Sequence, residues 1–103
     1  MVTVQFYLPT FDNAGMPFVR HHDNEFLEIT VVVFNGATVL PGLTHGRWYF
    51  QGKVYADECR IMSVSVEGML AQSADILAIV GFAKSHYQQE KIFVQYLGQS
   101  EIL

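Results

Sequence analysis

The residues from Gly42 to Val66 constrain the fold more than any other part of the chain. Aromatic and β-branched residues flank the pair Gln51-Gly52, and glycine tolerates the positive φ that a two-residue hairpin turn requires. The segment therefore predicts a β-hairpin. After the turn, Met62, Val64 and Val66 alternate with residues of the opposite face, which predicts that one face of this strand lies on a core.

The apolar pattern elsewhere predicts two more strands and a helix. Val2 to Leu8 alternates and is stopped by Pro9, and Ile92 to Leu97 alternates as the last strand. Ser73 is expected to cap a helix whose first turn holds Asp75, near the positive end of the helix dipole. An apolar stripe at helical spacing supports this helix, and it comprises Ile76, Ile79, Val80, Ala83 and Tyr87.

The segment from Glu25 to Asn35 is ambiguous. Its run Thr30 to Val33 favours a strand by propensity. The spacing of its apolar residues is closer to that of a helix, and Asn35-Gly36 suits a helix C-terminus. A strand here would leave three successive strands without cover, so we predict a helix, with Asp23 or Asn24 as its cap.

The resulting order of elements is β-α-β-β-α-β. Two split βαβ units with right-handed crossovers give an α+β ferredoxin-like sandwich, a four-stranded antiparallel sheet with two helices on one face. The length of 103 residues predicts one domain, residues 1–103.

Composition excludes several classes of function. A net charge of −4 without any cluster of Lys or Arg argues against a nucleic-acid partner. The longest apolar run, Ile29 to Phe34, is too short to span a bilayer, and one cysteine makes no internal disulfide. We expect a cytoplasmic protein with no membrane or nucleic-acid partner.

Few residues of the sequence indicate a particular catalytic or metal-binding chemistry. The four histidines show no metal-ligand spacing, so no metal site is predicted. Cys59 follows Glu58, which disfavours a thiolate, and is expected to be a small core residue. The pair Asp57-Glu58 lies where the hairpin becomes the central strand. Such a pair is commonly just solvated, and the aromatic residues around it, Trp48, Tyr49 and Tyr55, are equally consistent with sheet packing.

Two resemblances accompany these residues. FNGATVLPGLTHGRW, GKVYADECRIMSV and AKSHYQQEKIFV are similar to a family of short bacterial proteins of unknown function. The chain also resembles the phage-encoded S-adenosylmethionine-degrading enzymes. The matching positions are Gly46 and Tyr49 on the hairpin, Asp57-Glu58, Gln89-Glu90, and Val94-Gln95-Tyr96 with Gln99-Ser100. This chain departs from that pattern in its Asp-Glu pair, a longer loop before the second helix and a shorter Tyr-to-Glu spacing.

The second resemblance implies a lyase that forms methylthioadenosine and homoserine lactone from S-adenosylmethionine, with no metal or cofactor. It implies Glu58 and Tyr49 as catalytic residues, with Trp48 or Tyr55 as alternatives to Tyr49. Trp48, Tyr55, Asp57 and Gln89 are the expected substrate-binding residues. The rival hypothesis is a non-catalytic small-molecule-binding protein, or a phage-type inhibitor that blocks a host protein.

The composition also predicts self-association. Half of the residues are hydrophobic, and two helices cover only one face of a sheet. The other face is expected to carry Thr3, Tyr7, Ser63, Ser65, Phe93 and Gln95. We therefore predict a homo-oligomer, preferably a trimer, with the site between subunits.

Overall fold

The computed structural model describes residues 2–68 and 70–99, without the side chains of Trp48, Phe50 and Gln99. Its elements are β1 (Val2–Pro9), α1 (Arg20–Phe34), β2 (Thr38–Val39), β3 (Thr44–Phe50), β4 (Lys53–Val66), α2 (Ser73–His86) and β5 (Phe93–Gln99). The predicted ferredoxin-like α+β class is confirmed, and the ambiguous segment after Glu25 is helical.

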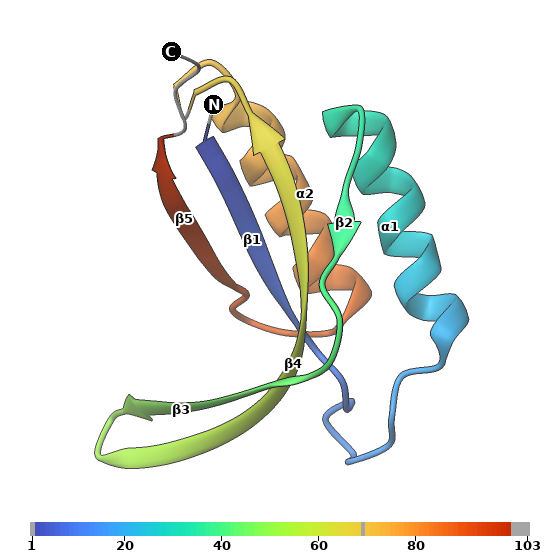
Figure 1. Ribbon diagram of the computed structural model, residues 1–103. Coiled ribbons are helices and arrows are strands. Elements are labelled where there is room, and N and C mark those ends of the chain that lie inside the picture. The colour runs from blue at the N-terminus through green and yellow to red at the C-terminus, as the bar shows by residue number, and fades with distance from the viewer. Residues whose placement is uncertain (1, 69, 100–103) are drawn as a thin grey trace.

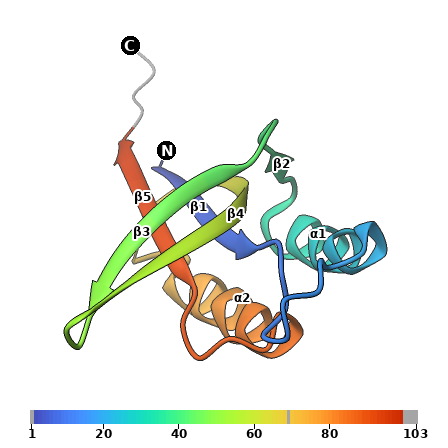
Figure 2. The same ribbon diagram turned by 90° about the horizontal axis from the view of Figure 1, so that it is seen from below.

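All strand pairs of the sheet are antiparallel, in the order β2-β4-β1-β5, with β3 also paired to β4 (Figures 1 and 2). The sheet has one strand more than the four predicted, because the expected connection from Ala37 to Leu43 contains β2. This two-residue strand pairs with Met62 and Ser63 of β4, while β3 pairs with the earlier part of the same strand, from Lys53 to Cys59. The segment containing Pro41-Gly42 separates the two pairings.

Helix α1 begins earlier than predicted. Its N-cap is Val19, and no side chain caps it, so the predicted cap at Asp23 or Asn24 is wrong. Asp23 instead lies in the first turn, where its carboxylate accepts a hydrogen bond from Tyr87. The predicted C-terminus is confirmed, because Asn35 has a left-handed φ of 62°.

Helix α2 also differs from the prediction at its start. Ser73 is the first helical residue and donates its hydroxyl to the carbonyl oxygen of Leu70 at 3.2 Å, so it is not the N-cap. Gln72 occupies that position. Asp75 lies in the first turn as predicted, and Ile76, Ile79, Ala83 and Tyr87 of the stripe are buried.

The core lies between the sheet and the two helices, which cover the same face (Figure 2). Alternate residues of β1 and β4 supply the sheet side, and their register pairs Val4 with Val64 and Phe6 with Met62. The buried helix residues face them, and they include Phe26, Phe34, Ile76, Ile79 and Ala83.

Stacked rings join the two helices. His22 of α1 and His86 of α2 stack with centroids 3.6 Å apart. Each Nε2 lies close to the other residue's carbonyl oxygen, at 2.6 and 2.7 Å. Since a carbonyl oxygen only accepts, both Nε2 atoms must carry hydrogen, which fixes how the rings face each other. Phe18 stacks on the outer side of His22, and Phe82 on that of His86.

The β3–β4 hairpin projects beyond the helical layer (Figure 1). Its turn is the predicted one, with φ of 51° at Gln51 and 77° at Gly52, as a type I′ turn requires. Residues 53–57 of β4 are exposed, whereas Met62, Val64 and Val66 are buried. One long strand therefore contributes both to the core and to the projecting hairpin.

Tyr87 offers a test of how the two helices are joined to each other. Its ring is fully buried, and its hydroxyl donates to Oδ1 of Asp23 at 2.6 Å. We expect Tyr87→Phe to lower the free energy of unfolding by about 1–3 kcal/mol, because the Asp23 carboxylate loses a donor in a partly buried site. Denaturant unfolding measures this difference.

The matched control is Tyr96→Phe, the same chemical change at a residue that is about half exposed. Its hydroxyl makes no hydrogen bond within the described part of the chain. A loss of stability in the control as large as that of Tyr87→Phe would contradict the assignment.

Candidate functional site

The two predicted acidic residues are neighbours in β4, at the base of the hairpin. The register of β3 with β4 places Asp57 opposite Gly46 and Glu58 opposite His45. These four residues, with Arg47 and Ala56, line a cavity of about 220 Å³. His45 and Arg47 were not predicted as site residues, and only the pairing of strands brings them to the carboxylates.

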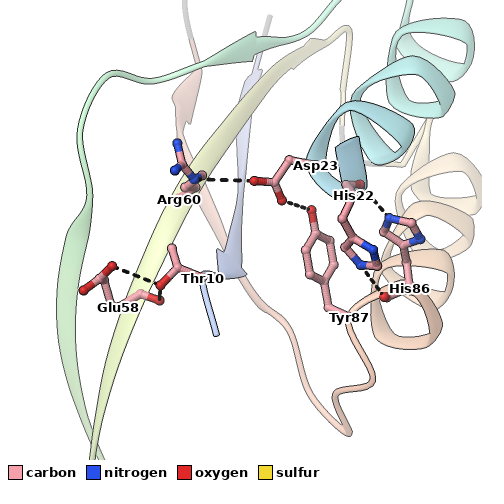
Figure 3. Close-up of polar contacts among 7 residues, drawn as sticks. All are labelled: Thr10, His22, Asp23, Glu58, Arg60, His86 and Tyr87. Carbon is pink, nitrogen blue, oxygen red and sulfur yellow. Dashed lines mark hydrogen bonds and ion pairs between the residues drawn. The ribbon is translucent and has the colours of Figure 1, made fainter. Parts of the chain in front are cut away.

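Glu58 is held in place by the chain that follows β1. The hydroxyl of Thr10 lies 3.1 Å from Oε1 of Glu58 and 3.2 Å from its backbone oxygen, and the Thr10 amide also donates to that oxygen (Figure 3). One carboxylate oxygen thus accepts a hydrogen bond from Thr10. Sequence reasoning missed Thr10, because 48 residues separate it from Glu58.

The aromatic residues lie further out on the hairpin. Tyr49 pairs with Val54, which is four residues from Glu58, or about 13 Å along a strand. Alternation places Tyr49 and Glu58 on one face of the hairpin, and Tyr55 and Asp57 on the other. Tyr49 is 76% exposed and Tyr55 is 44% exposed. Trp48 pairs with Tyr55 through its backbone, and its side chain lies outside the described residues.

Gln89 lies in the loop between α2 and β5. Its Nε2 donates to Oδ1 of Asn13 at 3.2 Å and to the backbone oxygen of Tyr87 at 3.1 Å. Both contacts are with the base of α2 and the loop after β1, and neither is with the hairpin. Within one chain, these hydrogen bonds join Gln89 to neither Tyr49 nor Glu58. Of the matching tail, Ser100 and the side chain of Gln99 lie outside the described residues.

A second, larger cavity of about 510 Å³ lies between the start of α1, β2 and β4. Asp23, on its wall, accepts from the Tyr87 hydroxyl at 2.6 Å and lies 3.4 Å from Nε of Arg60 (Figure 3). Burial, and then the hydrogen bond to Asp23, raise the pKa of Tyr87, which keeps the phenol a donor. Sequence reasoning missed this network, because its three residues come from three parts of the chain.

Neither a group of metal ligands nor a membrane-spanning helix is found within the described residues. Among residues 2–68 and 70–99, no three His, Cys, Asp or Glu side chains are grouped to hold a metal ion. Neither helix in those ranges is both long and apolar enough to cross a bilayer.

Cys59 is buried beside the carboxylate pair, as predicted for a core residue. Burial, and then the charges of Asp57 and Glu58, raise the pKa of its thiol to about 11. The thiol is therefore protonated at neutral pH and is a poor nucleophile.

Comparison with known proteins supports the fold only. The sequence matches no protein-family profile and no curated protein. The divalent cation tolerance protein Cut A1 from Thermus thermophilus superposes with a TM-score of 0.67 at 13% identity, over 100% of this chain and 88% of its own. The PII-like protein CutA from Nostoc sp. PCC 7120 gives 0.64 at 10% identity, over 96% and 81%.

A phage SAM lyase in complex with S-methyl-5′-thioadenosine superposes with a TM-score of 0.61 at 9% identity, over 93% of this chain and 79% of its own. The chain thus has a fold that is found in both CutA1 proteins and a phage SAM lyase. At these identities, the likeness does not distinguish an enzyme from a binding protein.

The raised pKa of Cys59 predicts a pH-dependent contribution to stability. The unfolded thiol ionises near its ordinary pKa, so above that pH the unfolded state binds fewer protons than the folded state. The stability that Cys59 provides is complete below that pH and declines as pH rises toward 11. We expect the free energy of unfolding of the wild type, minus that of Cys59→Ala, to fall by up to about 1.4 kcal/mol per pH unit in this interval.

Denaturant unfolding of both proteins at several pH values, from roughly the ordinary thiol pKa up to about 11, measures the difference. The variant cancels the titration of all other groups. A difference that stays constant over this interval would show that the thiol ionises alike in both states.

Proposed function

We propose that this protein cleaves S-adenosylmethionine into methylthioadenosine and homoserine lactone. A carboxylate oxygen of the substrate's methionine part attacks its own γ-carbon. The bond between that carbon and sulfur breaks, and its electron pair neutralises the sulfonium. No proton is transferred, so the reaction requires neither a general base nor an added nucleophile.

The main task of the protein is then to hold the substrate in the reactive conformation. Holding the reacting ends in a near-attack geometry contributes up to roughly 7–11 kcal/mol in favourable cases. A small acidic domain without a cofactor is adequate for this task, because the nucleophile and the leaving group are both parts of the substrate. Such a protein would act in the cytoplasm, where its substrate is made.

The observation that carries the proposal is a cavity at the base of an aromatic hairpin that both Asp57 and Glu58 help to line. Carboxylates attract a cationic substrate, and aromatic faces bind both a sulfonium and an adenine ring. A SAM lyase in complex with S-methyl-5′-thioadenosine, the thioether product proposed here, has the same fold, so the fold is compatible with this function.

The chemistry also restricts the role of Glu58. The sulfonium charge disappears as the bond to sulfur breaks, so a carboxylate next to it stabilises the substrate more than the transition state. The substrate's ammonium group keeps its charge throughout. We therefore assign Glu58 to orienting the substrate through that ammonium group or a ribose hydroxyl, with Thr10 fixing the carboxylate.

The site is incomplete within one chain, which supports an assembly. Tyr49 is largely exposed, and the side chain of Gln89 is hydrogen-bonded to Asn13 and not to the hairpin. The sheet face away from the helices carries Tyr7, whose hydroxyl donates to Gln95 at 2.7 Å and whose ring packs on Phe93. We propose a homotrimer whose sheets face a shared axis, so that each hairpin reaches the Gln89 end of a neighbour.

A second candidate function is favoured by one observation. The Cut A1 structure superposes with a higher TM-score than the lyase and over the whole chain. A non-catalytic protein that binds a small molecule between subunits would have the same fold. Such a protein would bind S-adenosylmethionine, or another ligand, and release it unchanged.

Incubation with S-adenosylmethionine, followed by mass spectrometry, tests the proposed activity. We expect methylthioadenosine and homoserine lactone in equal amounts, at the same rate with and without a chelator. Glu58→Gln keeps the shape and removes the charge, and we expect turnover to fall by more than tenfold, or about 1.4 kcal/mol.

The matched control is Glu28→Gln on the exposed side of α1, which removes the same charge away from the hairpin and should keep full turnover. Substrate recovered intact after long incubation would exclude the lyase. If it also binds in calorimetry, the second candidate replaces the first. Full activity of Glu58→Gln would remove that residue from the site.

Complementation tests the shared site. We expect Glu58→Gln and Gln89→Ala each to lose more than tenfold of turnover alone. Mixed after mild dissociation, they should recover part of the activity, because some interfaces then combine an intact hairpin with an intact opposite wall. Light scattering verifies the trimer, and mass spectrometry verifies mixing. Verified mixed trimers that stay inactive, or a monomer with full activity, would contradict an interface site.

A further inference from the structure

The cavity of about 510 Å³ beside α1 has a cationic rim and an apolar floor. Its size falls in the range of small-molecule sites. None of its lining residues belongs to the smaller cavity around Glu58. The proposed lyase function therefore leaves it without a role.

The charge of the rim is opposite to that of the whole protein. The chain has 10 acidic and 6 basic residues, yet this cavity is lined by two arginines, Arg20 and Arg60, against one carboxylate, Asp23. That carboxylate is already engaged by the Tyr87 hydroxyl and by Nε of Arg60. The rim is therefore positive on balance.

Both arginines keep donors for a ligand. Arg60 uses Nε toward Asp23, and Figure 3 shows its terminal nitrogens pointing away from that carboxylate. Its side chain is half exposed. Arg20 makes no ion pair or hydrogen bond with any other described side chain. A planar guanidinium with free N–H groups matches the oxygens of a carboxylate or phosphate.

The floor of the cavity suits a different part of the same ligand. Phe18 and Leu27 are partly buried there, and Val39 of β2 is 44% exposed. These side chains offer an apolar surface beneath the cationic rim. A free inorganic ion would leave that surface uncovered, whereas an anion attached to a compact apolar body would cover it.

We propose that this cavity binds a small amphiphilic anion, a carboxylate or phosphate monoester on a compact apolar body. Its anionic group lies between Arg20 and Arg60, and its apolar body rests against Phe18 and Leu27. The proposal does not depend on the lyase activity.

Calorimetric titration with phenyl phosphate and with phenylacetate tests the site and separates the two anions. Inorganic phosphate and benzyl alcohol represent each half of the ligand alone. We expect at least one of the two amphiphilic anions to bind tenfold or more tightly than either half. Amide chemical shifts should move at Leu27, Arg60 and Ile61. If neither anion binds better than its halves, the proposal fails.

Two pairs of variants locate the binding. Arg20→Gln should weaken it at least tenfold, whereas Lys84→Gln, which removes an equal charge from α2, should leave it unchanged. Val39→Trp on β2 should block the cavity, whereas Thr38→Trp, which alternation directs to the other face of the sheet, should not.

All four of these positions are exposed and lie outside the core, so folding should persist, and melting curves check this. Binding that survives both Arg20→Gln and Val39→Trp in folded protein would overturn the proposal.

Discussion

The register between β1 and β4 is the constraint on which the rest of the structure depends. It places Val4 opposite Val64 and Phe6 opposite Met62, with these side chains toward the helices. Because side chains alternate along a strand, a slip by one residue would turn the whole apolar set to the open face. The same alternation directs Glu58 and Arg60 to the helix side of β4, so the core determines where both charged groups lie.

A second constraint on the structure is the set of side-chain contacts between the two helices. His22 and His86 stack and exchange hydrogen bonds with each other's backbone, while Tyr87 reaches across to Asp23. Asp23 is in turn paired with Arg60 on the sheet. Polar groups in a partly buried site need partners, so these contacts restrict how α1 sits on β4. The larger cavity is what remains open between the two elements.

Strand β4 is long enough to run from the projecting hairpin, which we propose recognises a partner, into the buried core. Its second half is buried, and its first half extends into solvent with β3. An exposed arm that carries tyrosines and carboxylates has little to bind within its own chain. In the trimer that we propose, a neighbouring subunit supplies the opposite wall of the site, because closed symmetry repeats the same contact at each interface. The two proposed sites then differ in kind, one shared between chains and one contained in a single chain.

The sequence by itself determined the order of elements, the turn at Gln51-Gly52 and the apolar faces, since these depend on residues close together in the chain. It placed the carboxylates at the base of the hairpin for the same reason. It misplaced the starts of both helices, because α1 begins without a side-chain cap and Ser73 uses its hydroxyl on Leu70. Only the tertiary structure decided that Thr10 holds Glu58, that His45 faces it, and that Asp23 joins Tyr87 to Arg60. Those contacts join residues from distant parts of the chain or opposite sides of a hairpin, and no local pattern encodes such pairings.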